Sequence, residues 1–409
     1  MTKINERFAP AKIPGFESIL NRCERLRDII NPKSKNKLTF KDMATSLEDE
    51  IKRSSKVFIV GHNNPDLDSI GSAIGIQHLA TSYGKKAYII VGDDETKIDP
   101  GAKKIIDANR EKHKIINMKK FEKKVDENSF LIMTDVNDAK RTAVGDHIDS
   151  FRSKFIIDHH EQNENTTQAN HMYIDQSKSS ASEIVAEILN SKKIKIPAEV
   201  ATALLAGIKL DSDRFGQNTS DQTLDVARKL IKGGANNEYV SKLLLLDLDT
   251  RFRISELYVN GTVLYKLTNS TLSPIQVAIT FNRNSPETIY YEEDFAKLAD
   301  ELKKSVGVDA AFVMGYIESG LIKICARDTR GINVAQIMHE MNNGGGKPGA
   351  AATKIHSDDI FAVEKKLLEQ IKLGISGEEQ IKLGIENDRI LEEPKVEKVY
   401  QLQYQRKKV

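Results

Sequence analysis

Four short apolar runs alternate with helix-like stretches in the first half of the chain, and this alternation narrows the possible folds more than any other feature. The runs are VFIVG at 57–61, AYIIVG at 87–92, FLIMTD at 130–135 and FIIDHH at 155–160. Continuous apolar strands separated by helices are typical of a parallel sheet that helices cover on both faces. The sequence therefore predicts an α/β domain built around a parallel sheet.

Polar clusters follow three of these strands, and a further aspartate closes the apolar, helix-like run ATALLAGIKLD at 201–211. Together they contain the candidate metal ligands His62, Asp66, Asp68, Asp135, Asp158, His159, His160 and Asp211. Ligands of open α/β sheets bind at the carboxyl ends of the strands, so we expect these side chains to converge. A single aspartate after a strand is usually a cap or turn residue. So many converging acids would repel one another without a cation, and Asp and His suit Mn²⁺, Mg²⁺ or Fe²⁺.

The second half of the chain predicts a smaller α/β domain. Its expected elements are strands at 275–281, 310–317 and 321–327 and a helix near 293–305. The predicted division is a helical N-terminal extension at 1–54, the domain with the polar clusters at 55–267, a linker at 268–274, the smaller domain at 275–364 and a charged tail at 365–409. The tail repeats EQIKLGI at 369–375 and 379–385, which is too little for a solenoid and indicates a duplication in a surface helix or loose tail.

Composition excludes several classes of protein. The net charge of +2 is too small for a coat on long nucleic acid or for an anionic membrane surface, so an anionic substrate must be met locally. Two cysteines, Cys23 and Cys325, suit a reducing cytosol and exclude a disulfide framework or a cysteine-based zinc site. No run of about 18 apolar residues and no apolar signal core are present, so we expect a cytoplasmic chain without a membrane segment.

Six sequence motifs resemble those of a known superfamily. HNNPDLDSIGS, TDVND, IIDHHE and GIKLDSD resemble the four motifs of the DHH phosphoesterases, and INVAQIM and NNGGGKPGAAAT resemble motifs of their DHH-associated C-terminal domain. Within that superfamily, HNNPDLDSIGSAIGI, SSASEIVAEIL and ATALLAGIKLDSDRF are similar to the GdpP-like cyclic-di-AMP phosphodiesterases, whose membrane and sensor segments are missing here. The resemblance implies a parallel-sheet DHH domain and a smaller α/β domain, with the active site in the cleft between them.

The resemblance also implies two divalent ions, usually Mn²⁺, with Mg²⁺ or Fe²⁺ as alternatives. One ion would bind His62, Asp66 and Asp135, and the other would bind Asp68, Asp135, His159 and Asp211, with Asp135 as the bridge. Asp158 would orient a histidine, and His160 would face the substrate phosphate. Two such ions lower the pKa of a bridging water and hold the attacking and leaving oxygens of a displacement.

Seven further residues are candidate substrate contacts: Asn63, Arg214, Arg327, Gly344, Gly345, Gly346 and Lys347. Asn63 and Arg214 could equally be solvated, and Arg327 could be an ordinary surface cation. Glycines let backbone N–H groups approach a phosphate closely. Lys347 stands where the family has a histidine that usually touches the nucleotide, which leaves the identity of the substrate open.

The function that the resemblance implies is hydrolysis of cyclic di-AMP to linear pApA by an activated hydroxide. An enzyme of the same fold that degrades very short RNA or the bisphosphate pAp is the nearest alternative. An inorganic pyrophosphatase of the same superfamily is disfavoured, because the second domain of those enzymes lacks the glycine loop that this chain has. A nucleotide sensor without turnover is an alternative of another class, against which the complete ligand set argues. The expected partner is a small dinucleotide, and a homodimer is left open.

Overall fold

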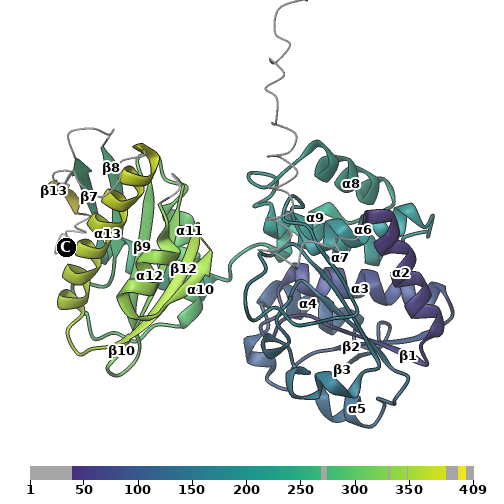
Figure 1. Cartoon of the computed structure of the whole chain (residues 1–409). Coiled ribbons are helices and arrows are strands. Elements are labelled where there is room, and N and C mark those ends of the chain that lie inside the picture. The colour runs from purple at the N-terminus through teal and green to yellow at the C-terminus, as the bar shows by residue number, and fades with distance from the viewer. Residues whose placement is uncertain (1–38, 269–273, 330–331, 348, 384–394, 402–409) are drawn as a thin grey trace, which may run out of the picture. The chain divides into compact units, whose positions relative to one another are not determined.

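The computed structural model describes residues 39–268, 274–329, 332–347, 349–383 and 395–401. The chain divides into two compact units, one ending at Leu245 and the other beginning at Leu246 (Figure 1). Of the predicted N-terminal extension, the structure describes helix α2 (Phe40–Arg53) and the residues beside it. This helix begins where the Thr39 side chain accepts a hydrogen bond from the Asp42 N–H, and it buries Met43, Leu47 and Ile51 on one face.

The first unit is built around a parallel sheet, as predicted. Its described strands lie in the order β3-β2-β1-β4-β5-β6, with bounds β1 (Lys56–Val60), β2 (Lys86–Ile90), β3 (Ile115–Ile116), β4 (Phe130–Thr134), β5 (Ser153–Asp158) and β6 (His171–Ile174). Every neighbouring pair is parallel. Val57 and Ile59 of β1 join one hydrophobic cluster and Phe58 and Val60 join another, so both faces of the sheet are buried.

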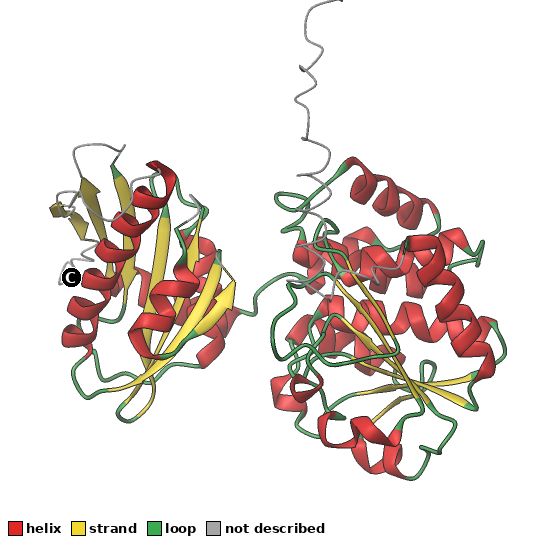
Figure 2. Cartoon of the chain, viewed as in Figure 1, coloured by secondary structure: helices red, strands yellow, loops and turns green. Residues whose placement is uncertain are grey.

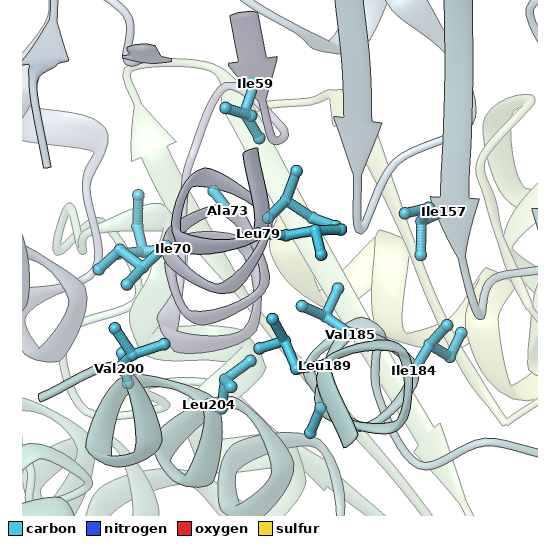
Figure 3. Packing of buried hydrophobic residues seen from close by; sticks show 14 of the residues in the cluster. Ile59, Ile70, Ala73, Leu79, Ile157, Ile184, Val185, Leu189, Val200 and Leu204 are labelled. Atoms are coloured by element: carbon cyan, nitrogen blue, oxygen red, sulfur yellow. The ribbon is translucent and has the colours of Figure 1, made fainter. Parts of the chain in front are cut away.

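Helices pack on both faces of this sheet, and short 3-10 turns lie in the connections (Figure 2). Their bounds are α3 (Leu67–Ser82), η2 (Glu95–Lys97), α4 (Pro100–Asn109), α5 (Met118–Glu122), η3 (Ala139–Arg141), η4 (Gly145–Ser150), α6 (Ala181–Ser191), α7 (Ala198–Asp211), α8 (Asp221–Lys232) and α9 (Asn237–Leu243). In Figure 3, side chains of α3, α6 and α7 interdigitate, with Ile70, Val185 and Leu204 among those labelled. Because α3 and α7 are buried on nearly all sides, their ends are held in fixed positions.

The second unit contains a mixed sheet in the order β11-β12-β10-β9-β8-β7-β13, in which only β8 and β9 pair in parallel among the described strands. The strands are β7 (Thr262–Thr268), β8 (Ile275–Thr280), β9 (Ala310–Glu318), β10 (Leu321–Asp328), β11 (Gly345–Lys347), β12 (Ala350–His356) and β13 (Lys395–Gln401). The helices are α10 (Leu248–Gly261), α11 (Glu292–Leu302), α12 (Val334–Asn342) and α13 (Ile360–Leu383). A second, smaller α/β domain was predicted, and the structure contains one, with a hydrophobic core of its own.

The domain boundaries differ from those predicted. The polar stretch at 268–274 lies between β7 and β8, which pair in one sheet, so β7 and the preceding α10 belong to the second unit. The segment predicted as a charged tail begins within α13, where Leu367 and Ile371 are buried in the core of that unit. Farther along, β13 pairs with β7, while the second EQIKLGI copy runs past the last described residue of α13. The charged composition of 365–409 therefore did not indicate the buried face of α13 or the strand β13. None of the helices within the described ranges is long and apolar enough to cross a membrane.

Candidate metal centre

The candidate ligands of the first unit converge at the carboxyl ends of three adjacent strands. The chain runs outward from β1 through β2 to β3 and then returns to β4 on the other side of β1, which makes a topological switch point between β1 and β4. His62 follows β1, Asp135 follows β4, and His159 follows β5. The N-terminus of α3 adds Asp66 and Asp68, and the C-terminus of α7 adds Asp211.

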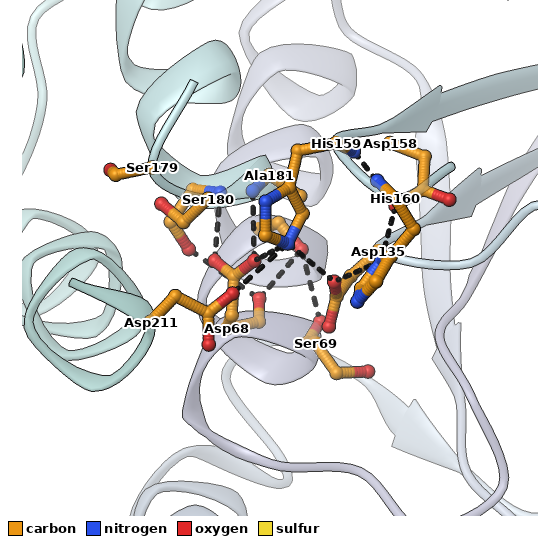
Figure 4. Close-up of polar contacts among 12 residues, drawn as sticks. Asp68, Ser69, Asp135, Asp158, His159, His160, Ser179, Ser180, Ala181 and Asp211 are labelled. Atoms are coloured by element: carbon orange, nitrogen blue, oxygen red, sulfur yellow. Dashed lines mark hydrogen bonds and ion pairs between the residues drawn. The ribbon is translucent and has the colours of Figure 1, made fainter. Parts of the chain in front are cut away.

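Asp135 belongs to three groups of close side chains among the described residues. One group is Asp135 with His62 and Asp66, another is Asp135 with Asp68, His159 and Asp211, and a third is Asp135 with Asp158, His159 and His160; within each group, one potential ligand atom per residue lies within 4.8 Å of the others. Figure 4 labels the members of the second and third groups. The His62 Nε2 atom is 3.4 Å from Asp135 Oδ2, and His159 Nε2 is 3.5 Å from Asp135 Oδ1. The first two groups are the sets that the resemblance assigns to two ions, so the candidate His/Asp metal site has the composition expected of it.

Asp135 has the geometry of a fixed, shared ligand. Its φ of 60° lies in the left-handed region, which aspartate enters more readily than most residues, and its N–H donates to Ile157 O at 3.0 Å. Its Oδ1 and His159 Nε2 are both buried and make no well-formed hydrogen bond among the described residues, although His159 Nε2 lies 3.0 Å from Asp211 Oδ2. Buried polar atoms without good hydrogen bonds are costly, and a cation would satisfy both of them. The donor set of carboxylates and imidazoles therefore fits a divalent ion.

Asp66 and Asp68 also act as helix caps. Asp66 Oδ1 accepts hydrogen bonds from the backbone N–H groups of Asp68 and Ser69. Asp68 is fully buried, and its two oxygens accept from Ala181 N and Ser182 N, both at 2.8 Å, at the start of α6. Each carboxylate oxygen has a second lone pair, so capping and metal binding are compatible.

A glycine allows α7 to approach Asp68. A Cβ atom at Gly207 would lie 2.6 Å from Asp68 Oδ1 and 2.3 Å from Ser182 Oγ. Any side chain at this position would therefore displace the carboxylate or the α6 N-terminus that holds it. The close packing of α3, α6 and α7 thus reaches directly into the centre.

The cluster has strongly perturbed proton affinities. Burial raises the pKa of Asp68 well above its usual range, and the charges of Asp135 and Asp211 raise it further. Burial opposes the charge on His62, but its hydrogen bonds with Asp135 and Asp66 outweigh burial and raise its pKa to about 10. Burial likewise opposes the charge on His159, but Asp135 and Asp211 outweigh burial and raise the pKa of His159 well above its usual value. Without an ion, the carboxylates thus favour the charged form of both imidazoles, and a divalent ion would compete with these protons.

Asp158 and His160 form a hydrogen-bonded pair that adjoins the cluster, since His160 Nδ1 also lies 3.5 Å from Asp135 Oδ1. The Asp158 carboxylate is fully buried, and its Oδ1 accepts from His160 Nδ1 at 2.8 Å. The His160 side chain is 40% exposed, whereas that of His159 is 11% exposed. The adjacent histidines thus have different surroundings, one directed into the carboxylate cluster and one accessible from solvent.

The predicted substrate contacts of the first unit, Asn63 and Arg214, each make a hydrogen bond to a backbone carbonyl. Asn63 is exposed, and its N–H donates to Arg141 O at 2.7 Å. Arg214 donates to Leu244 O at 2.9 Å through Nη2, and its own φ of 58° lies in the left-handed region. Neither contact excludes a substrate role, and both assignments stay predictions.

In the second unit, Arg327 is already paired, since its Nε and Nη2 donate to Asp300 at 2.9 and 3.2 Å. A substrate phosphate would have to compete with this carboxylate. Gly344 and Gly345 line a pocket of about 380 Å³. A Cβ at Gly344 would lie 2.6 Å from Met338 O, so glycine is required there. Gly346 and Lys347 lie on the edge strand β11, and the role of this loop stays a prediction.

One functional candidate was missed by the sequence analysis. Asn137 is buried, and its Nδ2 donates to Asp158 Oδ2 at 2.8 Å. It lies in the TDVND motif, two residues after Asp135, and its position there was the only sequence signal. An asparagine two residues after a candidate ligand is equally typical of an ordinary turn. Only the contact with Asp158 in the folded chain identifies Asn137 as a functional candidate.

Two family models match the chain, the DHH family N-terminal domain over residues 56–208 and the DHHA1 domain over residues 276–373. The cyclic-di-AMP phosphodiesterase GdpP of Geobacillus thermodenitrificans is 29% identical over 339 residues, which are 80% of this chain and 48% of that protein. The cyclic-di-AMP phosphodiesterase PdeA of Listeria monocytogenes is 28% identical over 348 residues, which are 82% of this chain and 50% of that protein. The chain therefore spans about half the length of these relatives.

A relative of similar length is the bifunctional oligoribonuclease and PAP phosphatase NrnA of Thermus thermophilus, 24% identical over 318 residues that cover 77% of this chain and 89% of that protein. Among solved structures, an exopolyphosphatase-related protein from Bacteroides fragilis has a TM-score of 0.65 at 19% identity and covers 82% of this chain and 98% of its own. This likeness supports the two-domain fold.

Proposed function

Because this chain belongs to the DHH phosphoesterase family, we propose that it is a two-metal phosphodiesterase that hydrolyses cyclic di-AMP to linear pApA. The observation that carries the proposal is the position of Asp135 in two His/Asp groups at once. The GdpP and PdeA relatives, named as cyclic-di-AMP phosphodiesterases, support the choice of substrate.

The residues divide the chemical work between them. His62 and Asp66 would hold one Mn²⁺ ion, Asp68, His159 and Asp211 would hold the other, and Asp135 would contact both. When bound, such ions lower the pKa of water and neutralise phosphate charge. Asp158 keeps the His160 Nδ1 atom engaged, which leaves Nε2 to donate a proton or hydrogen bond to a phosphoryl or leaving oxygen.

A second candidate function is hydrolysis of pAp or of very short RNA. The match to NrnA supports it, since that relative is covered over 89% of its length. Lys347 also favours it, because an ammonium group suits substrates with more exposed phosphate charge. A sensor without turnover is disfavoured by the complete ligand set. A substrate cleft between the domains, a homodimer and a cytoplasmic location stay predictions.

The test is a product assay with purified protein and Mn²⁺, in which cyclic di-AMP, pApA and pAp are supplied separately and the products are resolved by chromatography. We expect pApA to accumulate from cyclic di-AMP before AMP appears. Turnover of pAp or pApA without turnover of the cyclic form would favour the second candidate. Binding of all three without any product would support a sensor and contradict both enzymatic proposals.

A further inference from the structure

The amide of Asn137 is directed at a carboxylate that no part of the proposed chemistry uses directly. The side chain is 7% exposed, and its Nδ2 donates to Asp158 Oδ2 at 2.8 Å and to Glu161 O at 3.3 Å. An ionised carboxylate and a backbone carbonyl can only accept hydrogen bonds, so the amide nitrogen must face them. The orientation of Asn137 is therefore determined by its two acceptors.

Asp158 is held from both sides as a result. Its Oδ1 accepts from His159 N at 2.8 Å, from His160 N at 3.2 Å and from His160 Nδ1 at 2.8 Å. Asn137 provides the only donor to Oδ2 among the described residues. Because the carboxylate accepts from the ring of His160, the proton of a neutral imidazole must reside on Nδ1, and Nε2 is left free to act.

We propose that Asn137 is a positioning residue for the reaction, which fixes the Asp158 carboxylate and through it the Nδ1–H tautomer and ring orientation of His160. This inference rests on the proposed function, in which His160 faces the substrate phosphate. Without the amide, Oδ2 loses its donor inside the protein, and the carboxylate can turn away from the imidazole. The His160 ring is 40% exposed, and its other contacts among the described residues are the His159 ring, with centroids 4.4 Å apart, and Asp135 Oδ1, 3.5 Å from Nδ1, which is too long for a strong hydrogen bond.

Asn137 also fastens a loop, and this second role must be separated from the first. Its backbone oxygen accepts from Thr167 N at 2.7 Å, and Thr167 Oγ1 accepts from Ala139 N at 2.7 Å. The backbone contact survives replacement of the Asn137 side chain, whereas the long bond that Thr166 Oγ1 donates to Asn137 Oδ1 at 3.5 Å is lost. Thr167→Val removes only the Thr167 Oγ1 bond and leaves the Asn137–Asp158 contact in place, so it is a matched control.

The experiment combines kinetics with nuclear magnetic resonance of the full chain. Residues that orient ligands or catalytic histidines typically contribute 10–100-fold, so we expect Asn137→Ala to lower kcat by about tenfold, with KM changed by less than about twofold, for Mn²⁺-dependent hydrolysis of bis(p-nitrophenyl) phosphate. Asn137→Asp should lose more, because it places a second carboxylate against Asp158. Thr167→Val should stay near wild type.

The spectroscopic reading uses histidine labelled with ¹⁵N, with Mg²⁺ in place of Mn²⁺, and the His160 signals assigned from their absence in His160→Gln. We expect a single Nδ1–H tautomer in the wild type and a mixture of tautomers in Asn137→Ala. An unchanged tautomer in Asn137→Ala, or an equal loss of kcat in Thr167→Val, would overturn the proposal. If no phosphodiester is hydrolysed by the wild type, the proposed function fails, while the tautomer reading still decides whether Asn137 controls His160.

Discussion

Replacing the shared carboxylate is the sharpest test of the centre. Asp135→Asn keeps the size of the side chain, and asparagine also tolerates the φ of 60° found here, whereas alanine would add roughly 1 kcal/mol of backbone strain. The variant removes the one negative charge that faces both His62 and His159. Its effect should therefore be specific to the centre.

The expected magnitude follows from what the residue contacts. Residues that only orient metal ligands cost 10–100-fold when replaced, so loss of a ligand common to both groups should lower kcat/KM by at least about 100-fold, or about 2.7 kcal/mol of transition-state stabilisation. We expect the melting temperature without added metal to stay within about 4 °C, since one like charge leaves a crowded acidic cluster while the contacts with three histidines are lost.

The assay measures cyclic di-AMP turnover across a Mn²⁺ titration, with Mn²⁺ binding followed by calorimetry. Asp138→Asn is the matched control, because Asp138 caps the turn η3 three residues farther along and lies outside both groups. Retention of substantial Mn²⁺-dependent activity by Asp135→Asn would refute the shared role of Asp135. An equal loss of activity in both variants would show that any substitution in this segment disturbs the local fold.

Three further outcomes are expected. Gly207→Ala should release Asp68, so that Mn²⁺ affinity measured by calorimetry falls by at least about tenfold, while unchanged affinity would contradict the close packing of α7 on this carboxylate. Lys347→His should shift the ratio of kcat/KM values towards cyclic di-AMP over pApA by roughly tenfold, and an equal ratio in Lys347→His, Lys347→Ala and wild type would show that this side chain is neutral. Burial, assisted by the charge of Lys112, lowers the pKa of His113 to about 4. Below pH 6.5 the unfolded chain therefore binds a proton at this histidine more readily than the folded chain does. The free energy of unfolding should fall by up to about 3 kcal/mol as the pH drops from 6.5 towards 4. Urea unfolding at pH 7 and 4.5 should show a smaller drop for His113→Asn than for wild type, and equal drops would exclude His113 as the cause.

The parallel sheet could be predicted because its central strands are continuous apolar runs, as at Phe130–Thr134, where every residue is buried. The edge strands escaped prediction for the opposite reason. Strand β3 has two residues, and β6 (His171–Ile174) is mostly half-buried, so neither carries a clear apolar pattern. Strand β7 was placed in the wrong domain because a polar stretch after it resembled a linker, and only pairing with β8 shows where it belongs.

The candidate ligands could be predicted from type and spacing, since strand ends in one parallel sheet share an edge. Their other contacts could not. The α6 N-terminus that holds Asp68 lies more than a hundred residues farther along the chain, with hydrogen bonds spanning 113 and 114 positions. The contact between Asn137 and Asp158 spans 21 positions and depends on which way the chain turns after Asp135. Such contacts are set by tertiary structure and leave no periodic signal in sequence.

The candidate ligands begin at His62 and end at Asp211, and β1, β4, β5, α3 and α7 must all be in place before they meet. An unfolded chain therefore offers an ion only isolated side chains. Mass action then ties the two equilibria together, because an ion bound only by the native state stabilises it by about 2.7 kcal/mol at one hundred times its dissociation constant. A partly folded first unit that lacks one of these elements would not bring the candidate ligands together, so we expect ion binding to appear only when all five elements have formed.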